Sequence, residues 1–210
     1  MLSLPAHPDF AIASDETVWD GRFPLHVVRF RNRRFDGQIS GERVWELWHR
    51  GPAAALLPYD PAADAVVVIE QLRLPALAAG VDPVMVEFPA GLCDAGEDAA
   101  ATILRESQEE MGLVPDRLEP IGTFVLTPGG SDESCTLFAG RVTAPPADAD
   151  GIAAVGFGLA SEHEDIRVRV LPAAQAIAAA LDGAYPNSVT TIGLLWLAAR
   201  RDWLRARWRS

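Results

Sequence analysis

The chain has 210 residues, 49% of them hydrophobic, and carries 29 acidic against 18 basic residues, for a net charge of −11. This apolar fraction is enough to bury a full core. Every basic residue is an arginine, and the absence of lysine excludes P-loop, Schiff-base and protein-kinase chemistry. The acidic balance argues against nonspecific binding to nucleic acid or to an anionic membrane. A phosphate ligand would therefore be neutralised by arginine, backbone amides or metal ions.

Signals for targeting or redox chemistry are not apparent in the sequence. The first fifteen residues have no basic start and no continuous apolar stretch, as a signal peptide would. The longest apolar run near the other end, Ile192–Ala199, is too short to span a bilayer. Cys93 and Cys135 lack CxxC spacing, which favours two reduced thiols over a redox pair. We expect a cytoplasmic globular protein with neither a membrane nor a nucleic-acid partner.

The first half of the chain has the pattern of strands. Apolar residues and arginines interleave in Phe23–Phe35, and an Asp36-Gly37 turn leads into a returning strand at Arg43–Trp48. Short apolar runs bounded by turn residues follow, as is typical of buried strands. Strands are predicted from these runs at Ala53–Leu57, Ala65–Glu70 and Val84–Phe88.

The second half mixes helices with strands. Helical spacing predicts a helix over Asp98–Met111 that stops at Gly112. The arginines that end the chain could bind phosphate, but cations at a helix C-terminus are the interpretation we favour. The order of elements predicts an α/β sandwich with a mixed sheet. The remaining predicted elements are strands at Phe124–Leu126, Thr136–Val142 and Ile166–Leu171, a loop at Ala144–Gly151, and helices at Pro172–Asp182 and Ser188–Trp208.

The segment Gly91–Leu113 carries the strongest chemical signal. Glu106 and Glu110 lie one helical turn apart, with Glu109 beside them. Like charges at this spacing destabilise a helix, and hard oxygen ligands for a divalent cation explain why they are kept. Arg105 lies four residues before Glu109 and could orient it through a charge-assisted pair. A solvated acidic helix face is the alternative for the three glutamates alone.

This segment matches the Nudix box, GX5EX7REUXEEXGU, at each fixed letter. Ser107 stands where the pattern usually has an aliphatic residue. The runs at 69–73 (IEQLR), 127–134 (TPGGSDES) and 162–168 (EHEDIRV) resemble the ADP-ribose pyrophosphatase branch of the Nudix hydrolases, and the similarity extends from Phe23 to Trp208. The residues on the fixed letters are Gly91, Glu97, Arg105, Glu106, Glu109, Glu110 and Gly112.

The resemblance implies a Nudix-fold α/β/α sandwich with a mixed sheet, plus an N-terminal antiparallel β subdomain. Residues 1–50 would serve dimerisation and substrate contacts, and residues 51–210 would form the hydrolase domain. The implied reaction is Mg²⁺-dependent hydrolysis of ADP-ribose to AMP and ribose 5-phosphate by a homodimer. The alternatives are a pyrophosphatase for another sugar nucleotide, such as GDP-mannose, and a Nudix-fold binding module without turnover.

The resemblance also assigns the metal site. Glu106, Glu110 and Glu164 would bind two to three Mg²⁺ or Mn²⁺ ions, together with the carbonyl of Ala90. Such ions neutralise the phosphates and lower the pKa of a bound water. Glu109 would lie close by, and Glu97 and Arg105 would hold the loop and the glutamates in place.

Proton transfer and substrate contacts come from outside the box in this branch. The matching general base is Glu162, with His163 as the second candidate because a histidine titrates near neutral pH. Arg73 would clamp a phosphate, and Glu133 would bind the terminal ribose or assist catalysis. Stacking of the adenine would need a flat partner, for which Trp45, Trp48 and Phe23 are candidates. The resemblance also places Gly130 and Glu46 among the substrate contacts.

Overall fold

The computed structural model describes residues 4–208, and the chain divides into two compact units. The first unit contains the residues up to Pro52 together with Val125–Ser134. The second contains Ala53–Phe124 and the residues from Cys135 onward. The Nudix-box segment Gly91–Leu113 lies entirely within the second unit.

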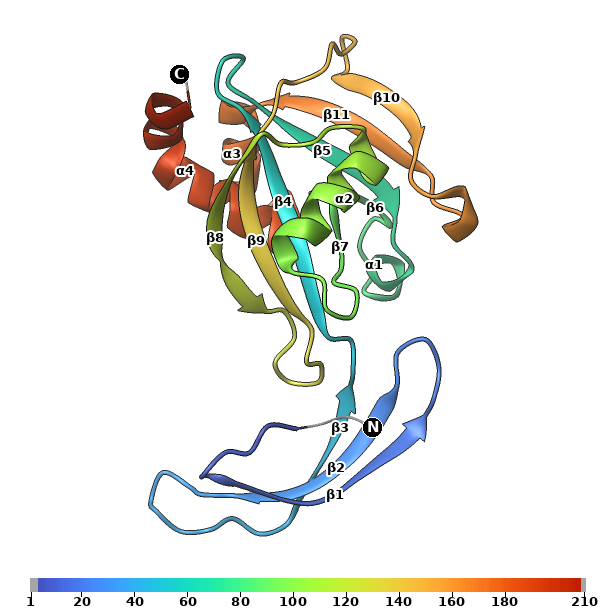
Figure 1. Ribbon diagram of the computed structural model, residues 1–210, viewed down its shortest axis with the longest axis vertical. Coiled ribbons are helices and arrows are strands. Elements are labelled where there is room, and N and C mark those ends of the chain that lie inside the picture. The colour runs from blue at the N-terminus through green and yellow to red at the C-terminus, as the bar shows by residue number, and fades with distance from the viewer. Residues whose placement is uncertain (1–3, 209–210) are drawn as a thin grey trace. The chain divides into compact units, whose positions relative to one another are not determined.

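The first unit is built on a three-stranded antiparallel sheet in the order β1-β2-β3 (Figure 1). Its strands are β1 (Phe10–Trp19), β2 (Leu25–Asn32) and β3 (Arg43–Trp48). Side chains alternate along β2, where His26, Val28 and Phe30 are buried. The predicted N-terminal antiparallel region is therefore confirmed.

The second sheet has eight strands. Six follow one path in the order β10-β11-β5-β4-β9-β8, while β6 pairs with β5 and β7 pairs with β4. Central strand β5 is buried along nearly its whole length, as its apolar run predicts. The bounds are β4 (Pro52–Asp60), β5 (Ala65–Leu72), β6 (Val84–Glu87), β7 (Ala90–Leu92), β8 (Arg117–Val125), β9 (Ser134–Arg141), β10 (Ile152–Phe157) and β11 (Ile166–Pro172).

Helices cover both faces of this sheet, with α2 on one side and α3 and α4 on the other (Figure 1). Beneath α2, Ile103 and Met111 share a buried cluster with Leu56, Val67 and Ile166 of the sheet. This is the predicted α/β/α sandwich. The helices are α1 (Leu74–Ala78), α2 (Ala99–Met111), the 3₁₀ turn η1 (Ala160–Glu162), α3 (Ala173–Leu181) and α4 (Ser188–Trp208).

Some predicted boundaries need correction. The strand expected at Phe124–Leu126 is longer and runs from Arg117 to Val125. Polar residues and Pro120 interrupt the apolar alternation in its first part, so the sequence pattern indicated only its end. The sequence patterns did not predict β1, α1, β7 or β10. Strand β1 is solvent-exposed throughout and is held by its backbone pairing with β2, so no hydrophobic period marks it.

Two further expectations concern membrane-spanning helices and the cysteines. Within residues 4–208, no helix combines the length and apolarity that a bilayer crossing requires. Cys93 and Cys135 are thiols rather than a disulfide pair.

Candidate functional site

The residues that flank helix α2 determine where it begins and ends. Asp98 caps its first turn by accepting a hydrogen bond from the Ala101 amide at 2.8 Å, and Gly112 ends it in the left-handed conformation at φ +67°. Ser107 is fully buried and its hydroxyl donates to the carbonyl of Ile103 at 2.5 Å. The serine in an aliphatic position of the box therefore packs inward with its polar group satisfied.

Arg105 connects three of the acidic side chains. Its Nη1 donates to Glu106 Oε1 at 2.8 Å and to Glu109 Oε2 at 3.2 Å. Its Nε and Nη2 donate to the two carboxylate oxygens of Glu97 at 3.3 and 3.2 Å. The structure thus brings these four box residues together, and the guanidinium offsets the repulsion among the carboxylates.

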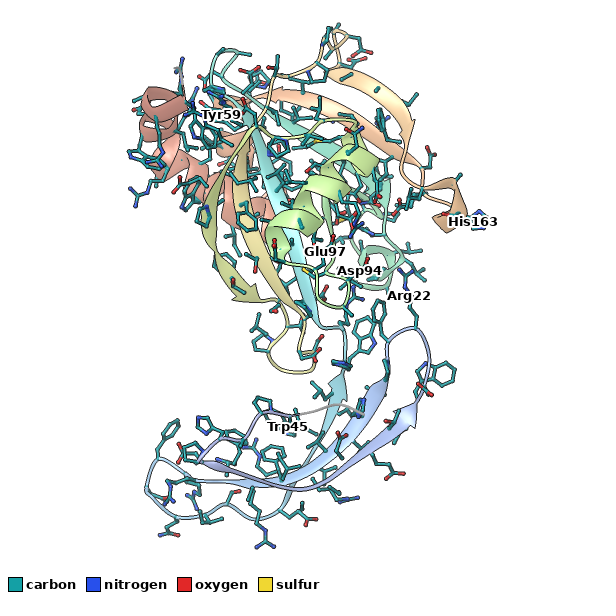
Figure 2. The ribbon with its side chains drawn as sticks, viewed as in Figure 1. Arg22, Trp45, Tyr59, Asp94, Glu97 and His163 are labelled. Atoms are coloured by element: carbon teal, nitrogen blue, oxygen red, sulfur yellow. The ribbon has the colours of Figure 1, made fainter. Side chains whose placement is uncertain are left out.

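Glu97 fixes the loop that leads into α2, where Figure 2 labels it beside Asp94. It accepts hydrogen bonds from the Asp94 amide at 3.2 Å and from the Thr102 hydroxyl at 2.9 Å, in addition to those from Arg105. These donors, Arg105 above all, lower the pKa of Glu97 to about 2. Glu97 is therefore a permanently charged anchor for Arg105.

Glu110 is the most deeply buried of the acidic box residues, with 4% of its surface exposed. Its Oε2 accepts the backbone N–H of Ala90, at the start of β7, at 2.9 Å. Burial above all raises the pKa of Glu110, to about 8; the charges of Glu106 and Glu164 contribute to the rise, whereas the Ala90 N–H and the charge of Arg73 oppose it. Such a carboxyl group favours a nearby positive charge.

Glu106 lies against the backbone of the loop before α2. A Cβ atom on Gly91 would overlap the Glu106 carboxyl group, so only glycine permits this approach. Burial also raises the pKa of Glu106, with Arg105 acting in the opposite direction and the charges of Glu109 and Glu164 adding to the rise. Side chains from α2 and from the loop before β11 therefore share one electrostatic field.

The loop before β11 carries the proposed base. Glu164 accepts the Leu159 N–H at 2.9 Å, and this bond closes the turn around η1. His163 ends that turn at φ +57° and points away from the unit at the tip of the loop (Figure 2). Glu162 is the last residue of η1, and its side chain lies outside the part of the chain that the structure describes.

These carboxylates do not yet form a closed metal shell. Among the described residues, no group of three or more His, Cys, Asp or Glu side chains is gathered tightly enough to hold an ion. Instead, Glu106 accepts a hydrogen bond from Arg105, and Glu110 accepts one from the Ala90 amide. The donor chemistry still fits a hard divalent cation, because the charge of Glu164 raises the pKa both of the buried Glu110 and of the half-buried Glu106.

Arg73 directly follows β5, in the second unit. Its Nε donates a hydrogen bond to Glu87 Oε2 at 2.9 Å, and its Nη2 forms an ion pair with the same oxygen at 2.9 Å. Its side chain is 43% exposed. The charge of Arg73 opposes the rise in the pKa of Glu110.

The first unit has its own polar and aromatic group. The guanidinium of Arg50 lies 4.4 Å from the ring centre of Phe23 and 4.7 Å from that of Trp48, and Arg50 forms an ion pair with Glu133 at 3.0 Å. Gly130 accepts the backbone N–H of Trp48 at 2.8 Å. Four of the predicted residues are thus brought together: Phe23, Trp48, Gly130 and Glu133.

Arg50 was not among the predicted residues. The sequence feature that could have indicated Arg50 is its position directly after an aromatic strand. Its partner Glu133 is distant in sequence and gives no local signal. Asp132 accepts the backbone N–H groups of Arg50 and Gly51 at 2.7 and 3.2 Å, which attaches the loop containing Glu133 to the end of β3.

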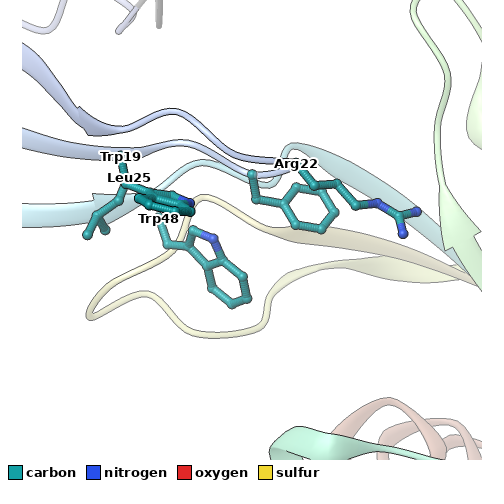
Figure 3. A pocket seen from close by; sticks show the side chains of 5 residues that line it. Trp19, Arg22, Leu25 and Trp48 are labelled. Carbon is teal, nitrogen blue, oxygen red and sulfur yellow. The ribbon is translucent and has the colours of Figure 1, made fainter.

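An open pocket of about 560 Å³ lies beside this group in the first unit (Figure 3). Its lining is mainly aromatic and aliphatic: Trp19, Arg22, Phe23, Leu25 and Trp48. Trp45 and Glu46 do not line it. The Trp45 ring instead contacts Phe30 at 5.4 Å and Arg43 at 4.9 Å, and Glu46 is an exposed residue of β3.

Comparison with known proteins decides the family. Residues 49–190 match the model of the NUDIX domain, which includes all of α2 and the loop before β11. The chain belongs to the Nudix family. The Arg105 and carboxylate group described above is therefore the Nudix box of this Nudix hydrolase.

Curated Nudix relatives cover almost the whole chain. An ADP-ribose pyrophosphatase of Escherichia coli (strain K12) is 40% identical over 200 residues, which are 95% of this chain and 93% of the relative. One from Haemophilus influenzae is 35% identical over 204 residues, or 96% and 91% of the two chains. A GDP-mannose pyrophosphatase of Yersinia pestis (strain Pestoides F) is 30% identical over 169 residues, covering 80% of this chain and 81% of its own.

A solved structure confirms the fold. The crystal structure of an ADP compounds hydrolase superposes with a TM-score of 0.66 at 20% identity and covers 99% of this chain and 100% of its own.

Proposed function

We propose that this Nudix hydrolase cleaves ADP-ribose to AMP and ribose 5-phosphate, with Mg²⁺ or Mn²⁺ as cofactor. The observation that carries the proposal is the complete set of box carboxylates, three of which are bound by Arg105 while the fourth, Glu110, is buried against the Ala90 amide. A binding module without turnover would have no need to keep this set. The substrate follows from the relatives named ADP-ribose pyrophosphatase, which match 95% and 96% of the chain.

Each side chain has a definite task in this proposal. Glu106, Glu110 and Glu164, with the carbonyl of Ala90, would hold two to three divalent ions. Bound ions neutralise the diphosphate and activate the attacking water. Arg105 would keep its bonds to Glu97 when Glu106 binds a cation, so the charge of the guanidinium would stay balanced in the loaded site.

The hydrolytic step needs one proton acceptor. Glu162 accepts the proton of the water that attacks phosphorus, and the P–O bond to the departing phosphate breaks. Arg73 would donate hydrogen bonds to phosphate oxygens of the substrate. His163 is the alternative acceptor, and its outward orientation makes it the weaker one (Figure 2).

The first unit supplies contacts for the rest of the substrate. Phe23, Trp48 and Arg50 offer flat faces that suit a nucleobase, while Glu133 would accept hydrogen bonds from ribose hydroxyls. Trp45 and Glu46 remain proposed contacts from the exposed side of β3. The aromatic residues exposed on this sheet, Trp19 among them, support the proposal of a homodimer, which we place in the cytoplasm.

A substrate panel tests the proposal. We expect kcat/KM for ADP-ribose to exceed that for GDP-mannose, NADH and diadenosine polyphosphates by at least about tenfold, because a buried polar contact missing in the wrong substrate costs that much or more. Preference for GDP-mannose would favour the second candidate, which rests on the 30% identical relative. Background rates for every compound would favour the binding module.

A further inference from the structure

Glu87 is a buried acid that the proposed reaction does not use. It ends β6, only 7% of its surface is exposed, and it lies three residues before Ala90. A carboxylate in such a place is costly unless hydrogen bonds satisfy it. Polar groups around Glu87 must therefore offset the cost of its burial.

Three hydrogen bonds and an ion pair meet at this one carboxylate. Oε2 accepts from Nε of Arg73 at 2.9 Å and from Nε2 of Gln71 at 3.1 Å, and Nη2 of Arg73 lies 2.9 Å away as an ion pair. Oε1 accepts from Nδ2 of Asn187 at 2.8 Å. Both oxygens are satisfied, and one of the donors, Asn187, is 100 residues from Glu87 in the sequence.

The strand geometry explains how Gln71 and Arg73 reach the same acceptor. Alternate residues of an extended strand point to one side, and Arg73 continues the extended backbone of β5 at φ −124°. Leu72 between them is 71% exposed and points away. Because β6 pairs antiparallel with β5, Glu87 lies beside this edge.

The contact with Arg73 uses only one edge of the guanidinium. Nε and Nη2 are taken up by Glu87, and Nη1 has no protein acceptor within residues 4–208. A guanidinium held along one edge presents its remaining N–H groups in a fixed direction. Arg73 is also close enough to influence Glu110, so that direction lies within the field of the box carboxylates.

Asn187 extends the arrangement to the C-terminal helix. It directly precedes α4, and its side-chain oxygen accepts the Thr190 N–H at 2.9 Å while its amide nitrogen donates to Glu87. Thr190 is fully buried, and a Cβ on Gly193 one turn later would overlap the ring of Phe88. The first turn of α4 is therefore packed tightly against the segment that contains Glu87.

We propose that Glu87 is a positioning residue that orients Arg73 toward the diphosphate of the substrate, and that Asn187 holds Glu87 for this task. The inference rests on the proposed function, since it needs a phosphate for Arg73 to bind. Glu87 itself does not touch substrate. Its removal should reduce activity only through Arg73.

A double-mutant cycle tests this dependence. In ADP-ribose hydrolysis, R73A should lower kcat/KM by about 100-fold and E87Q by about 30-fold, because misplacing a clamping group costs rates of this order. If Glu87 acts through Arg73, the double variant R73A/E87Q should be no worse than about threefold below R73A alone. Multiplied losses would overturn the proposal, as would an unchanged E87Q.

The matched control is E70Q. Glu70 lies on β5, is likewise 7% exposed, and pairs with Arg167 and Arg169 rather than with Arg73. The same substitution at Glu70 should lower the melting temperature but change kcat/KM by less than about threefold. Its effect should multiply with that of R73A, as expected of independent sites. An E70Q cycle as non-additive as that of E87Q would reduce Glu87 to a general structural role.

A second variant covers the case in which E87Q does not fold. Asn187→Ser keeps a helix-capping oxygen but removes the N–H that Glu87 accepts. We expect this substitution to lower kcat/KM by about threefold to tenfold when Arg73 is present. In the R73A variant it should have no effect. An equal loss in both backgrounds would contradict the proposal.

The same cycle is measured on the Kd of ADP by calorimetry with Mg²⁺, a readout that needs no turnover. Absence of ADP-ribose hydrolysis in the wild type would overturn the proposed function, while the ADP cycle would still decide the role of Glu87. Additive losses in ADP affinity would overturn the positioning role even if the wild type hydrolyses ADP-ribose.

Discussion

At the scale of single residues, Glu110 is the side chain whose burial conflicts most with its charge. Its pKa of about 8 means that the carboxyl group is largely protonated at pH 7 in the metal-free protein. A glutamine of the same shape is therefore a close substitute for that form. The residue is costly to ionise unless a cation is present.

We accordingly expect Glu110→Gln to keep the metal-free melting temperature within about 2 °C and to lower kcat by about 10³-fold or more. Circular dichroism and a steady-state assay measure the two effects. Glu119→Gln, which alters an exposed pair with Arg207, is the control and should retain full activity. Near-normal turnover by the Glu110 variant would refute the metal assignment.

The affinity for Mg²⁺ should depend on pH, and the raised pKa of Glu110 determines the direction of that dependence. Below about pH 8, Mg²⁺ has to displace the Glu110 proton, so the apparent affinity should rise by up to about tenfold per pH unit and level off above pH 8. Calorimetric titration at pH 6, 7, 8 and 9, in buffers of different ionisation enthalpy, measures both the affinity and the proton released. An affinity that does not change with pH would show that Glu110 is not a ligand.

The two candidate bases are separated by a pair of substitutions. Glu162→Gln should lower kcat by about 10²-fold or more, whereas His163→Ala should change it by less than about threefold, since His163 points outward. Steady-state kinetics at saturating ADP-ribose measures both. The reverse order of effects would transfer the role to His163.

At this scale the sequence predicts contacts within one helix well. Arg105 contacts Glu109 as expected, because residues four apart on a helix are neighbours. Contacts between distant segments carry no such local signal. Neither the Arg50 to Glu133 pair nor the Glu87 to Asn187 bond follows from a spacing rule.

At the scale of elements, an ionic group connects the β4–β5 turn to α4. Asp64 accepts hydrogen bonds from Arg201 and Arg205 of α4 and from the buried Tyr59 hydroxyl. Arg201 above all lowers the pKa of Asp64 to about 2. Because its pKa in the folded state lies below the ordinary value, Asp64 stabilises the fold above about pH 4 and loses this contribution as pH falls toward 2.

Replacing Asp64 by asparagine should cost about 2 kcal/mol at pH 7, the equivalent of the pKa shift. Asparagine tolerates the left-handed backbone at φ +56°, so the change isolates the charge. Urea unfolding at pH 7 and pH 3 measures the cost, which should shrink at the lower pH. Asp116→Asn, in the exposed pair with Arg141, is the control and should cost well under about 1 kcal/mol; equal costs at both sites would contradict the account.

Element prediction succeeded where hydrophobic period and turn residues agree. The ends of α2 follow from Asp98 and Gly112, and β3 and α4 have the predicted bounds. Strand β1 is exposed and mixes apolar with polar residues, and β10 is a short run without polar residues, so neither shows a clear alternation. Their pairing partners, β2 and β11, determine their conformation.

At the scale of the whole molecule, the family motif predicted the α/β/α sandwich more surely than any single element did. The motif spans one loop and one helix, but such a helix packs its apolar face on a sheet, as Ile103 and Met111 do here. The inclusion of Val125–Ser134 in the first unit could not be predicted, because it depends on the hydrogen bonds of Asp132 to Arg50 and Gly51.

The proposed dimer is tested on the intact chain. Light scattering after gel filtration should give twice the mass of one chain, since the exposed aromatic residues of β1 to β3 would otherwise face water. Trp19 is 66% exposed, and Trp19→Ser should shift the equilibrium toward monomer. A monomer in the wild type at micromolar concentration would refute the proposal.

The central claim is that the box carboxylates, loaded with a divalent cation, hydrolyse the diphosphate of ADP-ribose. The most direct test is to quantify AMP and ribose 5-phosphate formed from ADP-ribose by the wild-type protein with Mg²⁺, with a chelator, and with Mg²⁺ restored in excess. We predict equal amounts of the two products with Mg²⁺, none above background with the chelator, and full recovery on restoration. Product formation that persists in the chelator, or no AMP under any of the three conditions, would contradict the account.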